Sequence, residues 1–595
     1  MRNQLTTYLN KLAVATVVAY ALPIVAFAQH NPKLDVLSPK TNEHTARYII
    51  KFKTTPSSSD QFDSTASEQL LSAQKQQAIK IVKNKRGKKI NRTNMYTAKL
   101  NATQLQQLKN NSAVEYIEKD LPRYAYSYET TSGPAIASAI KLAGQASSKV
   151  SWGVTAVSAN NVSDEYASNR TICIIDTGYD INHPALANNP VSGTSVDDLA
   201  YWGDPVQPHG THVAGIISAS APKHSADDYG VRGVLPHQNI NIFSVRALND
   251  EGQASSSGII SAVEQCADNG ANVISMSLGG PTASKAEQET YQKIADQGIL
   301  VIAAAGNAGD TTKSYPASYD SVMSVASVDS ANKHSAFSQS NSQVEISAPG
   351  EAIISSVPVG KGRLANITLN GKSFFADGIV PQSRKVYSDE TNAMGQRPLI
   401  DKNINGSISA PLAVCNTNKG KYDCQDMQDK VCLVQRISNQ QTNKHPQSTE
   451  DIYPEVRAIN ACQQAGATAS IVYSNRQLKG LQNPFLVDLK GAISIPSVSV
   501  DYKTGSALVK DAGQKVTVNV ENGQDYDYYN GTSMATPFVS GVAALVWSYH
   551  PDMSAKELRK ALDENATHLG KFGRNAQYGF GLINAKATID ALNNK

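Results

Sequence analysis

Five short apolar runs, separated by segments of helical pattern, constrain the fold of this chain more than any other feature. They cover residues 172–175, 240–245, 273–276, 300–305 and 322–325. Strands that alternate with helices favour a parallel sheet with helices on both faces. The sequence therefore predicts an α/β core that begins near Trp152. Ligands of such sheets bind at the carboxyl ends of the strands, so residues that follow the runs are the first functional candidates.

Three of the runs are followed by polar residues suited to catalysis: Asp176, Ser277 and Asn307. Two further candidates lie in motifs rich in small residues, where His209 opens an expected helix and Ser533 precedes a long apolar segment. Asp, His and Ser in this chain order form one of the known arrangements of a catalytic triad. A serine near a helix N-terminus would lie where developing negative charge is stabilised, although such a serine is also a common helix cap.

The motifs DTG at Asp176, HGTHVAG from His209, SLGG from Ser277, AAGN ending at Asn307 and GTSMATP around Ser533 together resemble those of the subtilisin-like serine proteases (subtilases). The resemblance covers roughly residues 150–360 and 522–595 and implies an α/β fold with a doubly wound, mostly parallel sheet. It implies that Ser533 attacks a peptide carbonyl, that His209 is general base and then general acid, and that Asp176 orients the imidazole. Asn307 and the Ser533 N–H would stabilise the oxyanion, although an asparagine in such a motif can also serve a turn.

The same resemblance assigns a substrate pocket. It would be lined by Ser277, Leu278, Gly279, Ala304, Ala305 and Gly306, with backbones that pair with an extended substrate. Ser314 would lie near the pocket base, and its small uncharged side chain predicts tolerance of a bulky apolar residue before the cleaved bond. Glu251, near the expected substrate-edge strand, is a candidate for favouring a basic side chain at another subsite.

Up to about a quarter of the chain, at its N-terminal end, is predicted to be removed from the mature protein. Residues 1–28 have the pattern of a secretory signal. Residues 29–126 form an α+β pattern that resembles the inhibitor and chaperone propeptide of subtilases, and residues 127–149 are the expected linker with the maturation cut. The basic run 80–92 is either a nucleic-acid patch or a solvated face, and the formal net charge of +4 favours the latter. No run is long enough to predict a membrane anchor, so we expect a secreted protein.

The interval between His209 and Ser533 is longer than a single α/β lobe needs. Most of the excess lies in residues 363–522, whereas the catalytic domain is expected to comprise residues 150–362 and 523–595. Within the excess, strands at 430–436 and 467–474 flank a helix at 453–466, a pattern that resembles an inserted protease-associated (PA) domain, α/β or β-rich. Such an insert either flanks the cleft and binds substrate or is a passive stabilising element.

Four of the six cysteines, Cys415, Cys424, Cys432 and Cys462, lie in this insert. An even count in a secreted chain favours disulfides. Of three pairings we favour Cys415–Cys424 and Cys432–Cys462, and the alternative, a zinc site, lacks the usual close spacing. The other two, at positions 173 and 266, either pair or remain buried thiols.

The chemistry requires no cofactor, and no metal ligand is assigned. Many subtilases bind structural calcium, but the position of one family ligand is Ala185 here, two residues after His183. The companion loop at 225–233 is also rearranged, although Asp227 and Asp228 could serve differently. We therefore expect a secreted endopeptidase whose partners are protein or peptide substrates and its own propeptide. The alternatives are a processing protease with few substrates and a peptide-binding pseudoenzyme, which the intact catalytic positions disfavour.

Overall fold

The computed structural model describes residues 45–54, 65–84, 88–90, 94–126, 149–220, 231–389, 399–418, 420–437, 455–488 and 491–594. All of them belong to the unit Ser38–Lys595. The expected signal at 1–28, nearly all of the expected linker, and Asp227 and Asp228 lie outside the described residues.

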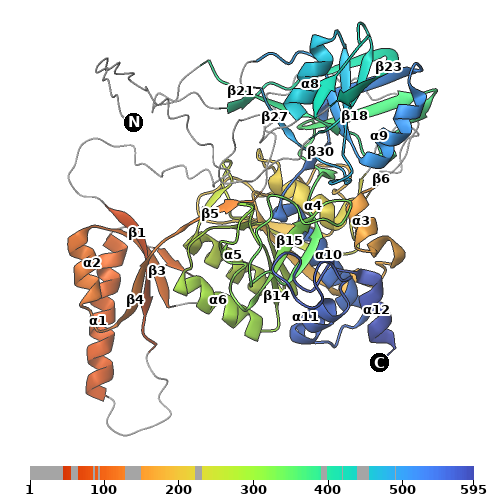
Figure 1. Ribbon diagram of the computed structural model, residues 1–595. Coiled ribbons are helices and arrows are strands. Elements are labelled where there is room, and N and C mark those ends of the chain that lie inside the picture. Colours follow the sequence, from red (N-terminus) through yellow and green to blue (C-terminus); the bar gives the residue numbers. More distant parts are fainter. Residues whose placement is uncertain are drawn as a thin grey trace, which may run out of the picture. The chain divides into compact units, whose positions relative to one another are not determined.

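A seven-stranded parallel sheet forms the core, as the apolar runs predicted (Figure 1). Its strand order is β16-β15-β14-β12-β7-β10-β8. The strands are β7 Thr171–Asp176, β8 Val191–Ser195, β10 Asn241–Arg246, β12 Val273–Met276, β14 Leu300–Ala304, β15 Val322–Val328 and β16 Ile346–Pro349. Because β10 and β12 lie on opposite sides of β7, the strand order reverses there, and the crevice at the carboxyl end of β7 is the expected ligand site.

Helices cover both faces of this sheet. Alternate residues of β7 enter two different cores: Ile172 and Ile174 pack with α4 (His209–Ser218) and α10 (Thr532–Tyr549), whereas Cys173 and Ile175 pack with α5 (Ser256–Asp268) and α6 (Lys285–Asp296). Since successive side chains of a strand point to opposite faces, a strand buried on both faces reads as a continuous apolar run. The remaining elements of this region are α3 Trp152–Ala156, α11 Ala555–Glu564, α12 Ala585–Asn593, β6 Lys149–Val150 with β9 Val231–Arg232, and β17 Ile353–Ser356 with β30 Tyr526–Tyr529.

The N-terminal region is an antiparallel four-stranded sheet with two helices on one face (Figure 1). Its elements are β1 Ala46–Phe52, α1 Thr65–Asn84, β2 Lys88–Ile90, β3 Met95–Leu100, α2 Ala102–Lys109 and β4 Val114–Lys119. This arrangement agrees with the expected α+β pattern, and its shortest strand, β2, has only three residues, two of them lysines. Lys88, from the basic run, has its Nζ 3.3 Å from Asp197 Oδ1, so this lysine faces an acidic partner within its own chain.

A short segment, β5 (Pro122–Ala125), follows this sheet and joins a different one. It pairs antiparallel with β11 (Gln253–Ser255) on one side and with β13 (Leu278–Gly279) on the other. The last described part of the N-terminal region is therefore an extended strand that lies between β11 and β13.

The insert is built on a nine-stranded mixed sheet. Its strands are β18 Gly362–Leu369, β19 Lys372–Ser373, β20 Val380–Pro381, β23 Gly406–Asn418, β24 Lys421–Asp423, β25 Val431–Gln435, β26 Ala469–Tyr473, β28 Ser497–Val500 and β29 Lys515–Gln524. Strands β23, β25, β26 and β28 run parallel, with helices α8 (Glu455–Gln464) and α9 (Tyr502–Leu508) beside them. A smaller sheet holds β21 Ser383–Tyr387, β22 Leu399–Asp401 and β27 Phe485–Val487. The first and last strands of the insert, β18 and β29, pair with each other, so the insert leaves and re-enters the catalytic region at one place.

Candidate active site

Asp176 and His209 are held together by a close contact between two motifs. Asp176 ends β7, and His209 is the first residue of α4. The His209 ring nitrogen Nδ1 lies 2.7 Å from Asp176 Oδ1, and both side chains are buried. A Cβ on Gly210 would lie 2.1 Å from the carbonyl oxygen of Gly178, so only glycine allows the helix to approach this turn. With Nδ1–H donated to the carboxylate, the other ring nitrogen is left as a proton acceptor.

Ser533 is the second residue of α10, which packs against α4. Its Oγ donates to the carbonyl oxygen of Ser277 (2.9 Å), and Ser277 Oγ donates to the carbonyl oxygen of Ser533 (2.7 Å). These reciprocal bonds place the end of β12 beside the start of α10. The central sheet and the helix that carries Ser533 therefore meet at the carboxyl edge of the strands.

The turn before Ser533 is held by residues of two regions. Gly531 N–H donates to the carbonyl oxygen of Gly350 (2.8 Å), and Ala352 N–H donates to Asn530 Oδ1 (2.8 Å). From the insert side, Asn530 Nδ2 donates to the carbonyl oxygen of Asn483 (2.7 Å). The insert thus contacts the turn that carries Ser533, an arrangement that the sequence pattern did not reveal.

Asn307 follows β14 and has a fixed amide orientation. Its Oδ1 accepts hydrogen bonds from the N–H and the Oγ1 of Thr532, at 2.9 and 2.8 Å. Because these donors identify the oxygen, Nδ2 points the other way and donates to the carbonyl oxygen of Tyr126 (2.7 Å). The amide donor is therefore held ready for a peptide carbonyl.

The segment that ends at Tyr126 lies in the expected substrate pocket. Tyr126 N–H donates to the carbonyl oxygen of Ser277 (3.2 Å), and its buried hydroxyl lies 2.5 Å from Ser314 Oγ. A Cβ on Gly279 would lie 2.5 Å from the Tyr126 ring, so this glycine makes room for the ring. Leu278 pairs with Ala125.

The other expected pocket residues, Ala304, Ala305 and Gly306, bond to neighbouring elements of the chain. Ala304 pairs with Val325 of β15, and Ala305 N–H donates to the carbonyl oxygen of the same valine (3.0 Å). Gly306 N–H donates to Thr532 Oγ1 (3.2 Å) and thereby supports the threonine that orients Asn307.

A buried ion pair lies farther along the same segment. Arg123 Nε donates to Glu287 Oε1 (2.9 Å) and Arg123 Nη2 to Glu287 Oε2 (2.6 Å), and both side chains are fully buried. Glu251, the acid that the sequence suggested for another subsite, is exposed, and Glu287 was not among the expected site residues. Glu287 was missed because it stands three residues after Ser284, the N-cap of α6, where a glutamate is ordinarily a capping residue.

His212 lies near the site and is fully buried. Burial, together with the neighbouring His209, lowers the pKa of His212 to about 3. Its Nε2 lies 3.1 Å from the carbonyl oxygen of Ile353, and its ring stacks on Tyr529 at 4.3 Å. A neutral, stacked imidazole of this kind packs the core and does not exchange protons near neutral pH.

Glu351 is a buried acid between the two residues that hold the Ser533 turn, Gly350 and Ala352. Burial, reinforced by Asp329, raises the pKa of Glu351 to about 8, with Arg436 opposing and Glu455 adding to the rise. Because the folded protein favours the protonated form of Glu351, this acid stabilises the fold fully below its ordinary pKa of 4.5. This contribution to the free energy of unfolding is lost as the pH rises to about 8.

Glu351→Gln is therefore expected to flatten the pH dependence of stability and to raise the free energy of unfolding at pH 8 by about 1–4 kcal/mol. The measurement is the thermal midpoint at pH 5 and pH 8, made on protein with Ser533→Ala to prevent self-digestion. Glu564→Gln, at a half-exposed acid paired with Lys560, is the control and should change neither value. The prediction would be contradicted if the thermal midpoints of Glu351→Gln and its parent changed equally between pH 5 and pH 8.

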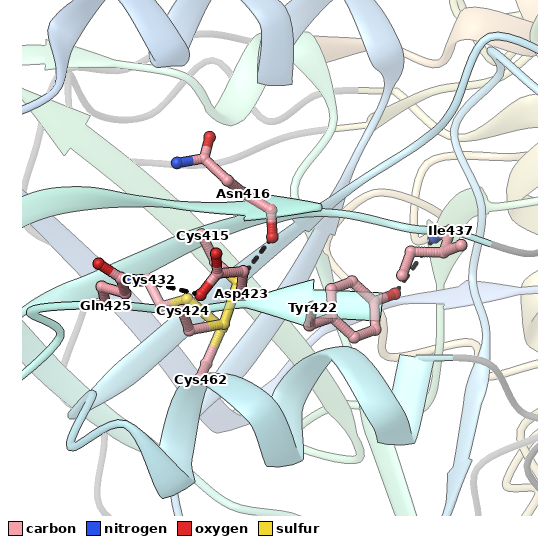
Figure 2. The surroundings of a disulfide bond; sticks show 9 residues. All are labelled: Cys415, Asn416, Tyr422, Asp423, Cys424, Gln425, Cys432, Ile437 and Cys462. Atoms are coloured by element: carbon pink, nitrogen blue, oxygen red, sulfur yellow. Dashed lines mark hydrogen bonds between the residues drawn. A yellow bond between two sulfur atoms is a disulfide. The ribbon is translucent and has the colours of Figure 1, made fainter. Parts of the chain in front are cut away.

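The insert cysteines form two neighbouring disulfides, Cys415–Cys424 and Cys432–Cys462 (Figure 2). The sulfur atoms of Cys415, Cys424 and Cys432 lie within 4.8 Å of one another. A zinc site at this cluster would require both bonds to be reduced, since cysteine binds the ion as the thiolate. A third disulfide joins Cys173 of β7 to Cys266 of α5 and ties the sheet to the helix that covers it.

The described residues at the family's calcium position do not fit that ion. Ala185 has no ligating side chain, and its carbonyl oxygen already accepts hydrogen bonds from Gln238 Nε2 (2.6 Å) and Ser220 N–H (3.0 Å). Among the described residues, the carbonyl oxygen of Ala185 is therefore engaged within the protein.

A doubly wound sheet with an Asp–His pair, a serine and an amide donor at its carboxyl edge is the arrangement of a serine peptidase. The chain belongs to the Subtilase family, whose model matches residues 167–373 and 401–581. A second model, Peptidase inhibitor I9, matches residues 47–126 and so ends at Tyr126.

Similar proteins agree with this assignment. Subtilisin DY of Bacillus licheniformis is 36% identical over 215 residues, which are 35% of this chain and 75% of that protein. Subtilisin E of Bacillus subtilis (strain 168) is 32% identical over 323 residues, 53% of this chain and 74% of that protein. The crystal structure of the psychrophilic subtilisin-like protease Apa1 from Pseudoalteromonas sp. AS-11 is 48% identical, with a TM-score of 0.69 over 76% of this chain and 99% of Apa1.

A more distant structure, fervidolysin from Fervidobacterium pennivorans, shares the fold at 18% identity, with a TM-score of 0.51 over 93% of this chain and 62% of that protein. The chain is thus a subtilisin-family serine endopeptidase, made as a self-processed precursor with an I9-type inhibitor propeptide. The expected family, fold class and activity are confirmed.

Proposed function

We propose that Ser533 is the nucleophile, that His209 is general base and then general acid, and that Asp176 orients the imidazole. Ser533 Oγ attacks the peptide carbonyl carbon while His209 takes its proton, and His209 then gives that proton to the leaving amine. Water hydrolyses the acyl-enzyme with the same groups. The 2.7 Å bond between His209 and Asp176 supports these roles because it selects the tautomer that can accept the proton.

The single observation that carries this mechanism is the hydrogen bond from Asn307 Nδ2 to the carbonyl oxygen of Tyr126. A peptide segment that is paired as a strand on both sides presents one carbonyl to the amide donor, beside Ser533. In the transition state this oxygen becomes negative, and the same donor stabilises it more strongly than in the ground state. Asn307 is accordingly the oxyanion donor.

The same observation supports Tyr126–Ser127 as the bond cut during maturation. The secreted product of the native chain is expected to begin at Ser127, because the carbonyl of Tyr126 is the one on the amide donor and the Tyr126 ring fills the pocket closed by Ser314. Intact mass and N-terminal sequencing at the earliest times test this. A first-formed N-terminus elsewhere in 128–150 would contradict it.

Export and domain boundaries follow from the same proposal. Residues 1–28 direct secretion, residues 29–126 are the propeptide, and residues 127–149 link it to a catalytic domain of 150–362 and 523–595. Within the described ranges, the chain contains no helix with the length and apolar character to cross a bilayer. The proposed secretion would bring the enzyme to protein substrates outside the producing cell.

The insert at 363–522 is a PA-type domain that positions the nucleophile turn. Its parallel strands with α8 and α9 support the type, and two contacts support the role. Asn530 Nδ2 donates to the carbonyl oxygen of Asn483, and Asn483 Nδ2 donates to that of Tyr528 (2.8 Å). Because both bonds reach residues just before Ser533, the insert is a support of the site and not a passive addition.

A further inference from the structure

The strand β5 shows which residues of a substrate meet which parts of the cleft. Its register sets Ala125 opposite Leu278, Tyr124 opposite both Gly279 and Gln253, and Arg123 opposite Ala254. If the bond after Tyr126 is the one cut, as proposed above, Arg123 occupies the fourth position before the cleaved bond. The protease residues around Arg123 then form the fourth subsite.

This subsite holds Arg123 by specific contacts of its guanidinium. The Nε and Nη2 atoms donate to the two oxygens of Glu287, at 2.9 and 2.6 Å, in a fork that matches arginine geometry. Nη2 also donates to the carbonyl oxygen of Thr282 (3.1 Å), whereas Nη1 donates within the bound segment itself, to the carbonyl oxygen of Pro122 (2.8 Å). A Cβ on Gly280 would lie 3.0 Å from Nη1, so this glycine leaves room for the guanidinium.

Glu287 is the part of this subsite that belongs to the protease and carries charge. It lies on α6 and is fully buried together with its partner. Burial raises the pKa of Glu287, and the guanidinium of Arg123 opposes that rise. A carboxylate left in such a place without a cation is costly, whereas an arginine restores its hydrogen bonds and its charge balance.

We propose that Glu287 makes the fourth subsite selective for arginine, so that the enzyme prefers segments with arginine three residues before an aromatic residue at the cleaved bond. This proposal rests on the proposed function. The ion pair does not serve the propeptide alone, because Glu287, Thr282 and Gly280 stay with the mature enzyme and would meet any substrate in the same register. A lysine would be accepted less well, since it cannot make the bidentate contact.

The first test uses the mature wild-type enzyme and three peptide p-nitroanilides, X-Tyr-Ala-Tyr, in which X is arginine, citrulline or alanine. Citrulline keeps the shape of arginine but lacks its charge. We expect kcat/KM to be roughly 100-fold higher for the arginine peptide than for the citrulline peptide, since loss of one member of a buried charge pair has effects of this order. Equal kcat/KM values would overturn the proposal. Hydrolysis of none of the three peptides would instead count against the proposed function.

The second test replaces the acid. Glu287→Gln is expected to lower kcat/KM for the arginine peptide to the level of the citrulline peptide and to leave the alanine peptide within a few-fold. Glu289→Gln is the matched control, because Glu289 lies on the same helix and contacts Tyr116 and Lys51 of the propeptide. The control should keep the preference. A Glu287→Gln enzyme that still prefers arginine would overturn the proposal, and if that variant fails to fold, the wild-type comparison with citrulline decides alone.

Discussion

Ser533→Ala is expected to abolish peptide hydrolysis and to leave the N-terminal region attached to the secreted chain. The substitution removes the hydroxyl of the proposed nucleophile, while the buried position next to Ser277 tolerates a methyl group. Loss of a serine nucleophile costs about 10⁶ in kcat, a magnitude measured in a subtilisin. The propeptide should therefore stay in the cleft, with Tyr126 on Asn307.

The measurement is the intact mass of the secreted product, with labelling by a serine-directed phosphonate beside it. Ser548→Ala is the control, since Ser548 is a buried serine near the far end of the same helix, and its hydroxyl donates to the carbonyl oxygen of Leu545 in that helix. The control should mature and react like the native chain. Equal processing of the Ser533→Ala and native chains would show that another protease makes the cut.

Asn307→Ala is expected to lower kcat by about 10²–10³ with little change in KM, a range taken from the corresponding donor in a subtilisin. The lost Nδ2 donor acts mainly on the charged oxygen of the transition state. Since alanine also frees the two Thr532 donors, Asn307→Asp is needed as a second variant, because it keeps the acceptor oxygen and loses the donor. Both should be slow in the maturation reaction as well.

If Asn307 had a purely structural role, the expected results would differ. Asn307→Ala would then lower the thermal midpoint and preserve kcat, and Asn307→Asp would behave like the native enzyme. Asn341→Ala is the control for this alternative, since Asn341 is a buried asparagine whose Nδ2 donates to the carbonyl oxygen of Thr312 (2.9 Å). Asn341→Ala should lower the thermal midpoint and leave kcat nearly unchanged.

The central sheet was predictable because each of its interior strands is apolar on both faces. Short continuous runs such as 172–175, which alternate with segments of helical pattern, favour strands of a parallel sheet, and Asp176 stands at the strand end where the sheet order reverses. Motifs of small residues were informative for a related physical reason. Gly210 and Gly279 stand where any side chain would collide with backbone or ligand, so their presence marks close approach.

The parts that escaped prediction depend on contacts between distant segments. Glu287 follows a serine cap on a polar helix, and nothing local shows that its side chain turns inward to meet Arg123. Asn483 lies in a segment of the insert without a periodic pattern, yet it reaches the Ser533 turn.

The pairing of β18 with β29 affects how much loop must close during folding to bring His209 and Ser533 together. His209 and Ser533 are 324 residues apart, and the register that sets Gly362 opposite Gln524 removes 162 of these from the loop that must close between them. Once the insert has folded, the remaining loop is half as long. Halving a loop lowers its closure entropy cost by only about 0.6 kcal/mol. A large insertion at this point is therefore almost neutral for assembly of the catalytic site, provided that the insert folds first.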